Sequence, residues 1–225
     1  MAGEYKFPRQ IRIKVVLMKI SILRSLSAVL LILLFLESAL AGKILVTRSD
    51  ESSQTLQVIG NIDPELTTSL LNLKSNPAFS YRKKTTFIFD NPGGYVESGA
   101  YLPIFILDLS FKIKDGSGSS LLVRIERECH SMCIFVFNAV ANMNKEDIDI
   151  EVSRHALFGF HAASVGNAVH RGATEYYIDK LLLYGASPEW ISDNRWMFNR
   201  RSVTYVSAEK LADENSGIVE HEYLN

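Results

Sequence analysis

Short apolar runs alternate along the chain with longer segments of helical spacing, and this alternation limits the folds that the chain can adopt. The runs that predict strands are rich in β-branched and aromatic residues and cover 55–60, 85–90, 120–125, 148–152 and 156–161. The segments that predict helices cover 64–74, 95–109, 131–143, 171–185 and 207–215. Pro64 lies at a helix start, where its missing N–H does no harm, whereas Pro103 is expected to kink the second helix. We therefore predict an α/β fold with mainly parallel strands, in which functional groups gather where strands end and helices begin.

The segment 1–41 has the pattern of a secretory signal peptide. Its apolar run, 26–36, follows several basic residues and precedes Ala39-Leu40-Ala41, a small-x-small cleavage pattern. The run is about half the roughly 20 residues that a membrane-spanning helix needs, although an uncleaved leader would act as an anchor. Met18 begins a compact basic segment of its own and is an alternative translation start. We predict cleavage after Ala41 and export of the protein to the periplasm or beyond.

The segment 42–225 shows no internal repeat and no linker, so a single domain is expected. The whole chain has 225 residues and a net charge of −1, and the leader carries six basic and two acidic residues, so cleavage leaves a net charge of −5. An acidic exported domain has no electrostatic attraction for phosphate backbones or anionic lipids. We therefore expect no nucleic-acid partner and membrane contact only through an uncleaved leader, and we expect a peptide, protein or small-molecule partner.

Two junctions between a predicted strand and a predicted helix carry chemistry. Paired glycines in Asp90-Asn91-Pro92-Gly93-Gly94 allow backbone N–H groups to face outward, and Ser131 lies within Cys129-His130-Ser131-Met132-Cys133 at the start of a helix. Separately, each motif has a structural interpretation: a tight turn, a helix N-cap for Ser131, and a structural histidine for His161 at the end of the next strand. Taken in order they supply an oxyanion donor, a nucleophile and a general base.

The ordered motifs resemble the proteolytic subunit of Clp-type serine proteases, in the ClpP/crotonase superfamily, and more closely its exported relatives. The resemblance spans about 54 to 220 and rests on these segments: Thr55–Gly60 with Asn61-Ile62, Asn91-Pro92-Gly93-Gly94, Ser131-Met132, Gly159-Phe160-His161, Tyr205–Glu209 and Gly217-Ile218-Val219. It implies repeated ββα units with an extra terminal helix, and a protein that often forms homo-oligomers. An extended peptide would lie along the edge formed by Gly93 and Gly94.

Carried over to this sequence, the resemblance implies Ser131 as nucleophile, His161 as base, and the N–H groups of Gly94 and Met132 as the oxyanion hole. The family's acidic triad member has no counterpart, because the segment 201–204 holds no carboxylate. The nearest acids in the sequence, Asp193 and Asp213, do not fit the expected place, and His161 would then act in a Ser-His dyad of reduced efficiency. The residues after His161 are two alanines instead of the family's Gln-Pro pair.

Cys129 and Cys133 flank Ser131 two residues away on each side. At a helix start, residues four apart have Cα atoms roughly 6 Å apart, within the range of a disulfide. Because export places both thiols in an oxidising compartment, we predict a Cys129–Cys133 disulfide, while two buried small side chains remain the alternative. A metal site with His130 would have only three ligands packed around one helix start, which is a poor zinc site.

These patterns predict an exported serine hydrolase, acting on peptides through Ser131 and His161 without a cofactor or metal. The alternative is a binding or assembly module that keeps the fold and has lost the triad, which the missing acid would suggest. An acyl-CoA enzyme of the crotonase branch is disfavoured because an exported protein does not normally meet CoA esters.

Overall fold

The computed structural model describes residues 41–143, 146–165 and 168–225. The predicted leader, with its alternative start at Met18, lies outside these residues except for Ala41. The segment Ala41–Asn225 forms one compact unit. Within its described part, no helix has both the length and the apolar character needed to cross a membrane.

The larger sheet has five strands in the order β1-β2-β3-β4-β6. Its strands are β1 (Lys43–Ser49), β2 (Ser53–Ile59), β3 (Lys84–Ile88), β4 (Leu121–Ile125) and β6 (Ile148–Val152). Only β1 runs antiparallel to its neighbour, and the β2–β3, β3–β4 and β4–β6 pairs are parallel. The predicted α/β class with mainly parallel strands is confirmed for this sheet.

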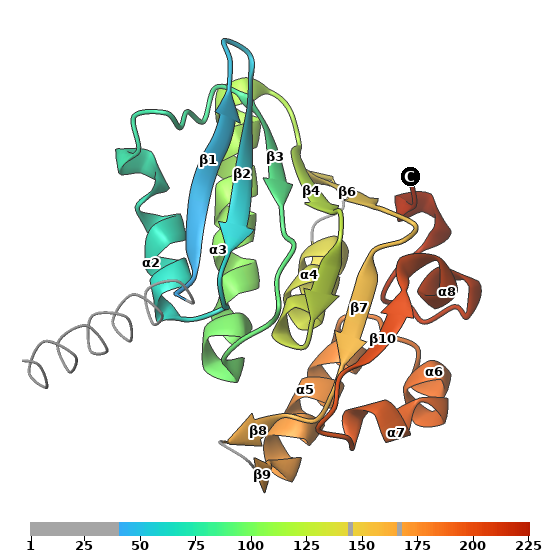
Figure 1. Cartoon of the computed structure of the whole chain (residues 1–225). Coiled ribbons are helices and arrows are strands. Elements are labelled where there is room, and N and C mark those ends of the chain that lie inside the picture. Colours follow the sequence, from blue (N-terminus) through green and yellow to red (C-terminus); the bar gives the residue numbers. More distant parts are fainter. Residues whose placement is uncertain (1–40, 144–145, 166–167) are drawn as a thin grey trace, which may run out of the picture. The chain divides into compact units, whose positions relative to one another are not determined.

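A smaller sheet has the order β10-β7-β5, and Figure 1 shows β7 and β10 side by side. Its strands are β5 (Glu128–His130), β7 (Leu157–Phe160) and β10 (Thr204–Ser207). The β5–β7 pair is parallel and the β7–β10 pair is antiparallel. A short hairpin of β8 (Ser164–Val165) and β9 (Ala168–Val169) follows β7. These short strands position the residues on either side of them, including Ser131 after β5 and His161 after β7.

The α-helices follow the strands along the chain as the alternation predicted (Figure 1). They are α2 (Pro64–Leu71), α3 (Val96–Ser117), α4 (Met132–Met143), α5 (Arg171–Leu183), α6 (Pro188–Asp193), α7 (Arg195–Phe198) and α8 (Ala208–Asp213). Two 3₁₀ turns, η1 (Leu73–Ser75) and η2 (His221–Tyr223), complete the described elements.

Helix α4 lies in the core that joins the two sheets. Every residue from Met132 to Ala141 is buried, and Phe137 packs edge-on against Phe158 of β7 with ring centroids 5.8 Å apart. A helix that is apolar on all sides is stable only when the protein surrounds it. The burial of α4 therefore holds its N-terminal end, and Ser131 before it, in one place.

The prediction for the second helix was wrong at its C-terminal end. Helix α3 continues through Pro103 to Ser117 and ends at Gly118, whose φ of 72° is the left-handed cap conformation. Proline inside a helix costs about 3 kcal/mol. The apolar side chains buried on both sides of it outweigh this cost because they anchor α3 to the core; they include Leu102, Ile106, Leu109 and Ile113.

Candidate active site

Ser131 occupies a strained turn between β5 and α4. Its φ is +50°, which a residue with a Cβ seldom adopts. The turn is held by hydrogen bonds from the Ser131 N–H to the Gly159 carbonyl (2.8 Å), and to the Ser131 carbonyl from the Ile134 N–H (2.9 Å) and the Tyr177 hydroxyl (3.1 Å). Burial raises the pKa of Tyr177, so its phenol stays protonated and donates.

The N-cap interpretation of Ser131 does not fit this geometry. An N-cap residue has an extended backbone, and its side chain accepts a hydrogen bond from the helix. Ser131 has a left-handed backbone, and within the described part of the chain its hydroxyl makes no hydrogen bond. A strained serine whose hydroxyl is not used by the fold is available for chemistry.

His161 follows β7, and its ring orientation is fixed by the chain itself. Its Nδ1 lies 2.7 Å from the carbonyl oxygen of Ala162. A carbonyl can only accept, so in the neutral ring Nδ1 carries the proton and Nε2 keeps its lone pair. The Ala162 N–H donates in turn to the Arg200 carbonyl at 2.7 Å, which holds this peptide in place. His161 therefore has the tautomer that a general base needs.

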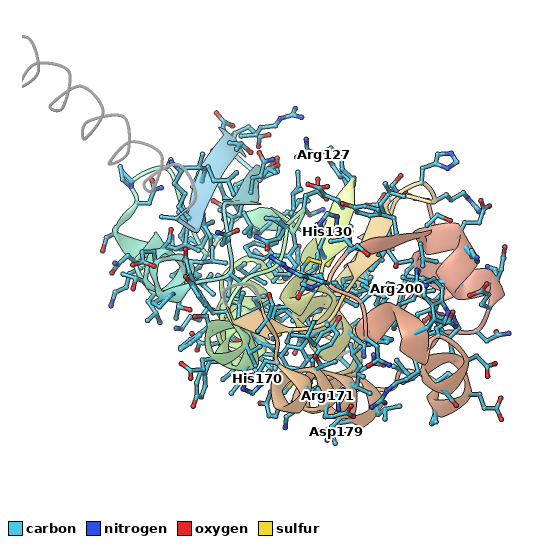
Figure 2. The ribbon with its side chains drawn as sticks, turned by 60° about the horizontal axis from the view of Figure 1, so that its bottom comes forward. Arg127, His130, His170, Arg171, Asp179 and Arg200 are labelled. Atoms are coloured by element: carbon cyan, nitrogen blue, oxygen red, sulfur yellow. A yellow bond between two sulfur atoms is a disulfide. The ribbon has the colours of Figure 1, made fainter. Side chains whose placement is uncertain are left out.

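Ser131, His161 and Gly94 line one cavity of about 730 Å³. The structure therefore brings together three residues that lie far apart in the sequence. The N-terminal ends of four helices, α2, α3, α4 and α5, contribute to its wall through Glu65, Glu97, Ser131 and His170. Figure 2 shows His170 and Arg171 together at the start of α5. Because helix N-termini carry partial positive charge, this arrangement favours negative charge developing on a bound substrate.

The Gly93-Gly94 turn presents one backbone donor. The Ile62 N–H donates to the Gly93 carbonyl and the Tyr95 N–H donates to the Ile62 carbonyl, both at 2.8 Å, so the Gly94 N–H faces away from Ile62. A Cβ on Gly93, whose φ is +95°, would lie 2.9 Å from the Ser131 Cβ, and one on Gly94 would lie 2.2 Å from the Ile62 carbonyl oxygen. Only glycines fit between Ile62 and Ser131.

Met132, predicted as the other donor, is buried and is not among the residues that line the cavity. It is the first residue of α4, so its N–H has no acceptor within the helix. The Met132 side chain packs against Gly99 of α3, where a Cβ would lie 2.4 Å from the Met132 methyl carbon. This contact holds the first turn of α4 against α3, which begins beside Gly94.

The structure joins Cys129 and Cys133 by a disulfide, with Cα atoms 5.2 Å apart. Both cysteines are fully buried. The bond ties the middle of β5 to the first turn of α4 and so spans Ser131. Within the described ranges, no group of three His, Cys, Asp or Glu side chains is placed to hold a metal ion.

Intact mass measurement checks the disulfide. The protein, analysed without reductant, is expected to weigh about 2 Da less than after reduction, since the bond replaces two S–H groups. Alkylation under denaturing, non-reducing conditions should leave Cys129 and Cys133 unmodified. Two freely alkylated thiols would contradict the assignment.

Neither acid considered from the sequence lies at the site. Asp193 is exposed at the end of α6, and Asp213 is exposed and lies 3.6 Å from the Nε2 atom of His221. The cavity is lined instead by two exposed glutamates, Glu65 and Glu97, in the first turns of α2 and α3. Among the described residues no carboxylate forms a hydrogen bond or an ion pair with His161.

The packing role of His130 was not predicted from the sequence. His130 is 9% exposed. Its ring lies edge-on to Tyr205 with centroids 5.1 Å apart and covers Gly159, where a Cβ would lie 2.7 Å from the ring. Burial lowers the pKa of His130; nearby Glu128 opposes this and His161 adds to it. Figure 2 shows His130 beside the disulfide. A buried neutral His130 therefore packs behind the Ser131 turn, and the glycine two residues before His161 is the sequence signal of this close approach.

Comparison with known proteins gives no family assignment. No protein-family model matches the sequence, and neither does any curated protein. The function is therefore argued from the arrangement of Ser131, His161 and Gly94 around the cavity.

Proposed function

We propose that the protein is an exported serine hydrolase that acts on peptides, with Ser131 as nucleophile and His161 as general base. The observation that carries this proposal is the shared cavity. It is lined by a strained serine with an unused hydroxyl, a histidine with its Nε2 lone pair free, and a glycine whose N–H faces away from its paired strand. The three residues are stronger evidence together than separately, because acyl transfer needs a nucleophile, a base and an oxyanion donor at one place.

The reaction follows from these groups. His161 Nε2 takes the proton from Ser131 Oγ while Oγ bonds to the substrate carbonyl carbon, whose oxygen becomes an oxyanion. The N–H groups of Gly94 and Met132 stabilise this oxyanion, helped by the dipole of α4. Protonated His161 gives its proton to the leaving amine as the C–N bond breaks. Water, deprotonated by His161, then attacks the acyl carbon, and protonated His161 returns the proton to Ser131 Oγ as the ester C–O bond breaks.

The carbonyl of Ala162 orients the His161 ring, which is one of the two functions of the acid in a complete triad. It accepts a hydrogen bond from His161 Nδ1 at 2.7 Å, which fixes the tautomer and the ring orientation. A carboxylate would also stabilise the imidazolium by its full charge, whereas a carbonyl offers only its dipole. We therefore expect a slower enzyme than one with a complete triad.

The order of elements supports the ClpP/crotonase-like fold that the motifs suggested. The unit β4-β5-α4 is followed by β6-β7, the β8–β9 hairpin and α5; in each unit the first strand joins the larger sheet and the second joins the smaller one. Ser131 and His161 come directly after the second strand of successive units. A repeated ββα unit would bring them together in this way.

The substrate proposed is an extended peptide. On the side away from Ile62, the backbone of Gly94 leaves its N–H unused by the pairing with that strand, and Tyr95 beside it is 67% exposed. A peptide could pair along this edge and place a carbonyl group over Ser131. The disulfide is compatible with an extracellular or periplasmic location, where such peptides occur and CoA esters do not.

The absence of a carboxylate on His161 in the described residues favours the second candidate, a binding module that has lost catalysis. A fluorophosphonate probe separates the two, because it reacts with an activated serine and not with an ordinary hydroxyl. We expect covalent labelling of the folded protein at Ser131, located by mass spectrometry of the peptides. Folded protein that remains unlabelled would favour the binding module.

A further inference from the structure

Gly42 is buried, and its backbone nitrogen contacts a buried carboxylate. The Gly42 N–H donates to Asp63 Oδ2 at 2.8 Å, while the other oxygen, Oδ1, accepts from the Leu66 N–H at 2.8 Å. Asp63 is 5% exposed and is the N-cap of α2. In the described part of the chain, no Lys, Arg or His side chain forms an ion pair with Asp63. A buried carboxylate without a cation is unusual, because burial disfavours an uncompensated charge.

Gly42 is also the residue that directly follows the predicted cleavage site. Hydrolysis of the Ala41–Gly42 peptide bond adds hydroxyl to the Ala41 carbonyl and hydrogen to the Gly42 nitrogen. That nitrogen becomes a primary amine, which is protonated at neutral pH. We propose that removal of the leader leaves the α-ammonium group of Gly42 at this place, where it forms a buried ion pair with Asp63.

The surroundings of Gly42 suit a chain terminus that is glycine. A Cβ there would lie 2.1 Å from the Asn61 carbonyl oxygen and 2.6 Å from the Leu66 Cβ, so no larger residue fits. The Asp63 carboxylate is an acceptor 2.8 Å from the Gly42 nitrogen, and an ammonium there has three N–H donors. The preceding residue, Ala41, is only half-buried.

The ion pair lies next to the wall of the candidate active site. Asp63 follows Ile62, whose N–H and carbonyl hold Gly93 and Tyr95, and it precedes Glu65, which lines the cavity. Anchoring the new terminus to Asp63 therefore stabilises the segment against which the Gly94 donor is set. The proposal requires cleavage after Ala41 but does not depend on the hydrolase activity.

The test uses the full chain, expressed with its leader in a bacterium and purified from the periplasm. N-terminal sequencing is expected to begin at Gly42. A second protein carries one serine inserted between Ala41 and Gly42, which moves the amine away by one residue after the same cleavage. Asp63→Asn is made in both forms, because asparagine remains a good N-cap while removing the charge.

We expect Asp63→Asn to lower the thermal midpoint by about 5 °C more in the Gly42 form than in the serine-extended form. A difference of this size corresponds to a charge pair worth about one to two kcal/mol at the midpoint of unfolding. Without any change at Asp63, the Gly42 amine should react with a neutral-pH acylating reagent about tenfold more slowly than the serine-extended amine, because the ion pair keeps it protonated. A start other than Gly42, or equal amine reactivity together with equal midpoint losses, would overturn the proposal.

Discussion

Ser131→Ala is expected to abolish fluorophosphonate labelling and all hydrolysis of peptides or activated esters. Alanine has no oxygen with which to attack a carbonyl, and the remaining groups can only polarise the substrate. In serine hydrolases, loss of the nucleophile lowers kcat by about 10⁶-fold. The measurement is turnover of an activated ester, with labelling of the purified proteins run in parallel.

The same change should leave the fold intact. Within the described residues the Ser131 hydroxyl has no hydrogen-bond partner, so its loss should change the free energy of unfolding by about 0.5 kcal/mol or less. Asp193→Ala and Asp213→Ala are controls, because both carboxylates are exposed and neither lines the cavity. Turnover that persists in pure Ser131→Ala protein would remove Ser131 as nucleophile and the hydrolase assignment with it.

The parallel strands of the larger sheet were predictable because they follow a simple rule. Such strands appear as short runs rich in apolar and β-branched residues, and the runs at 85–90, 120–125 and 148–152 match β3, β4 and β6 closely. Strands β1, β5 and β10 were not predicted. β1 lies at the edge of the larger sheet and most of its residues are exposed, whereas β5 and β10 are only 3 and 4 residues long and pair with β7. No local periodicity can mark strands so short.

Helices α6 and α7 were not predicted because they are also short. They have 6 and 4 residues, too few for a periodic apolar face, although Ser187 and Pro188 form an N-cap signal at the start of α6. The extension of α3 beyond 109 was not predicted because Asp108, Lys112 and other polar residues on its exposed side interrupt the apolar pattern. Tertiary packing of its buried side outweighed that local pattern.

The candidate site was only partly predictable. Ser131, His161 and Gly94 could be named because each lies at a strand end, where α/β folds gather functional groups. The sequence could not show that the Ala162 carbonyl orients His161, because every residue has a carbonyl. It also gave no sign that Tyr177 would hold the Ser131 turn, since this contact joins residues 46 positions apart.

His161→Ala is expected to lower kcat/KM for an activated ester by about 10³- to 10⁴-fold, since general base catalysis contributes roughly this factor. The double variant Ser131→Ala/His161→Ala should be no slower than Ser131→Ala, because a nucleophile and its base act as one unit. His170→Ala is the matched control. His170 also lines the cavity, but its Nδ1 accepts from the Ala173 N–H at 3.0 Å and caps α5, so its loss should act on stability more than on turnover.

Added imidazole distinguishes a catalytic role of His161 from a structural one. Truncation to alanine leaves space beside Ser131 in a cavity of about 730 Å³, which can admit a free imidazole molecule. If His161 acts only as a base, imidazole should restore part of the activity of His161→Ala and none in Ser131→Ala. Labelling of His161→Ala at the wild-type rate, with no response to imidazole, would mean that another group activates Ser131. The proposed role of the Ala162 carbonyl in orienting a catalytic base would then also be wrong.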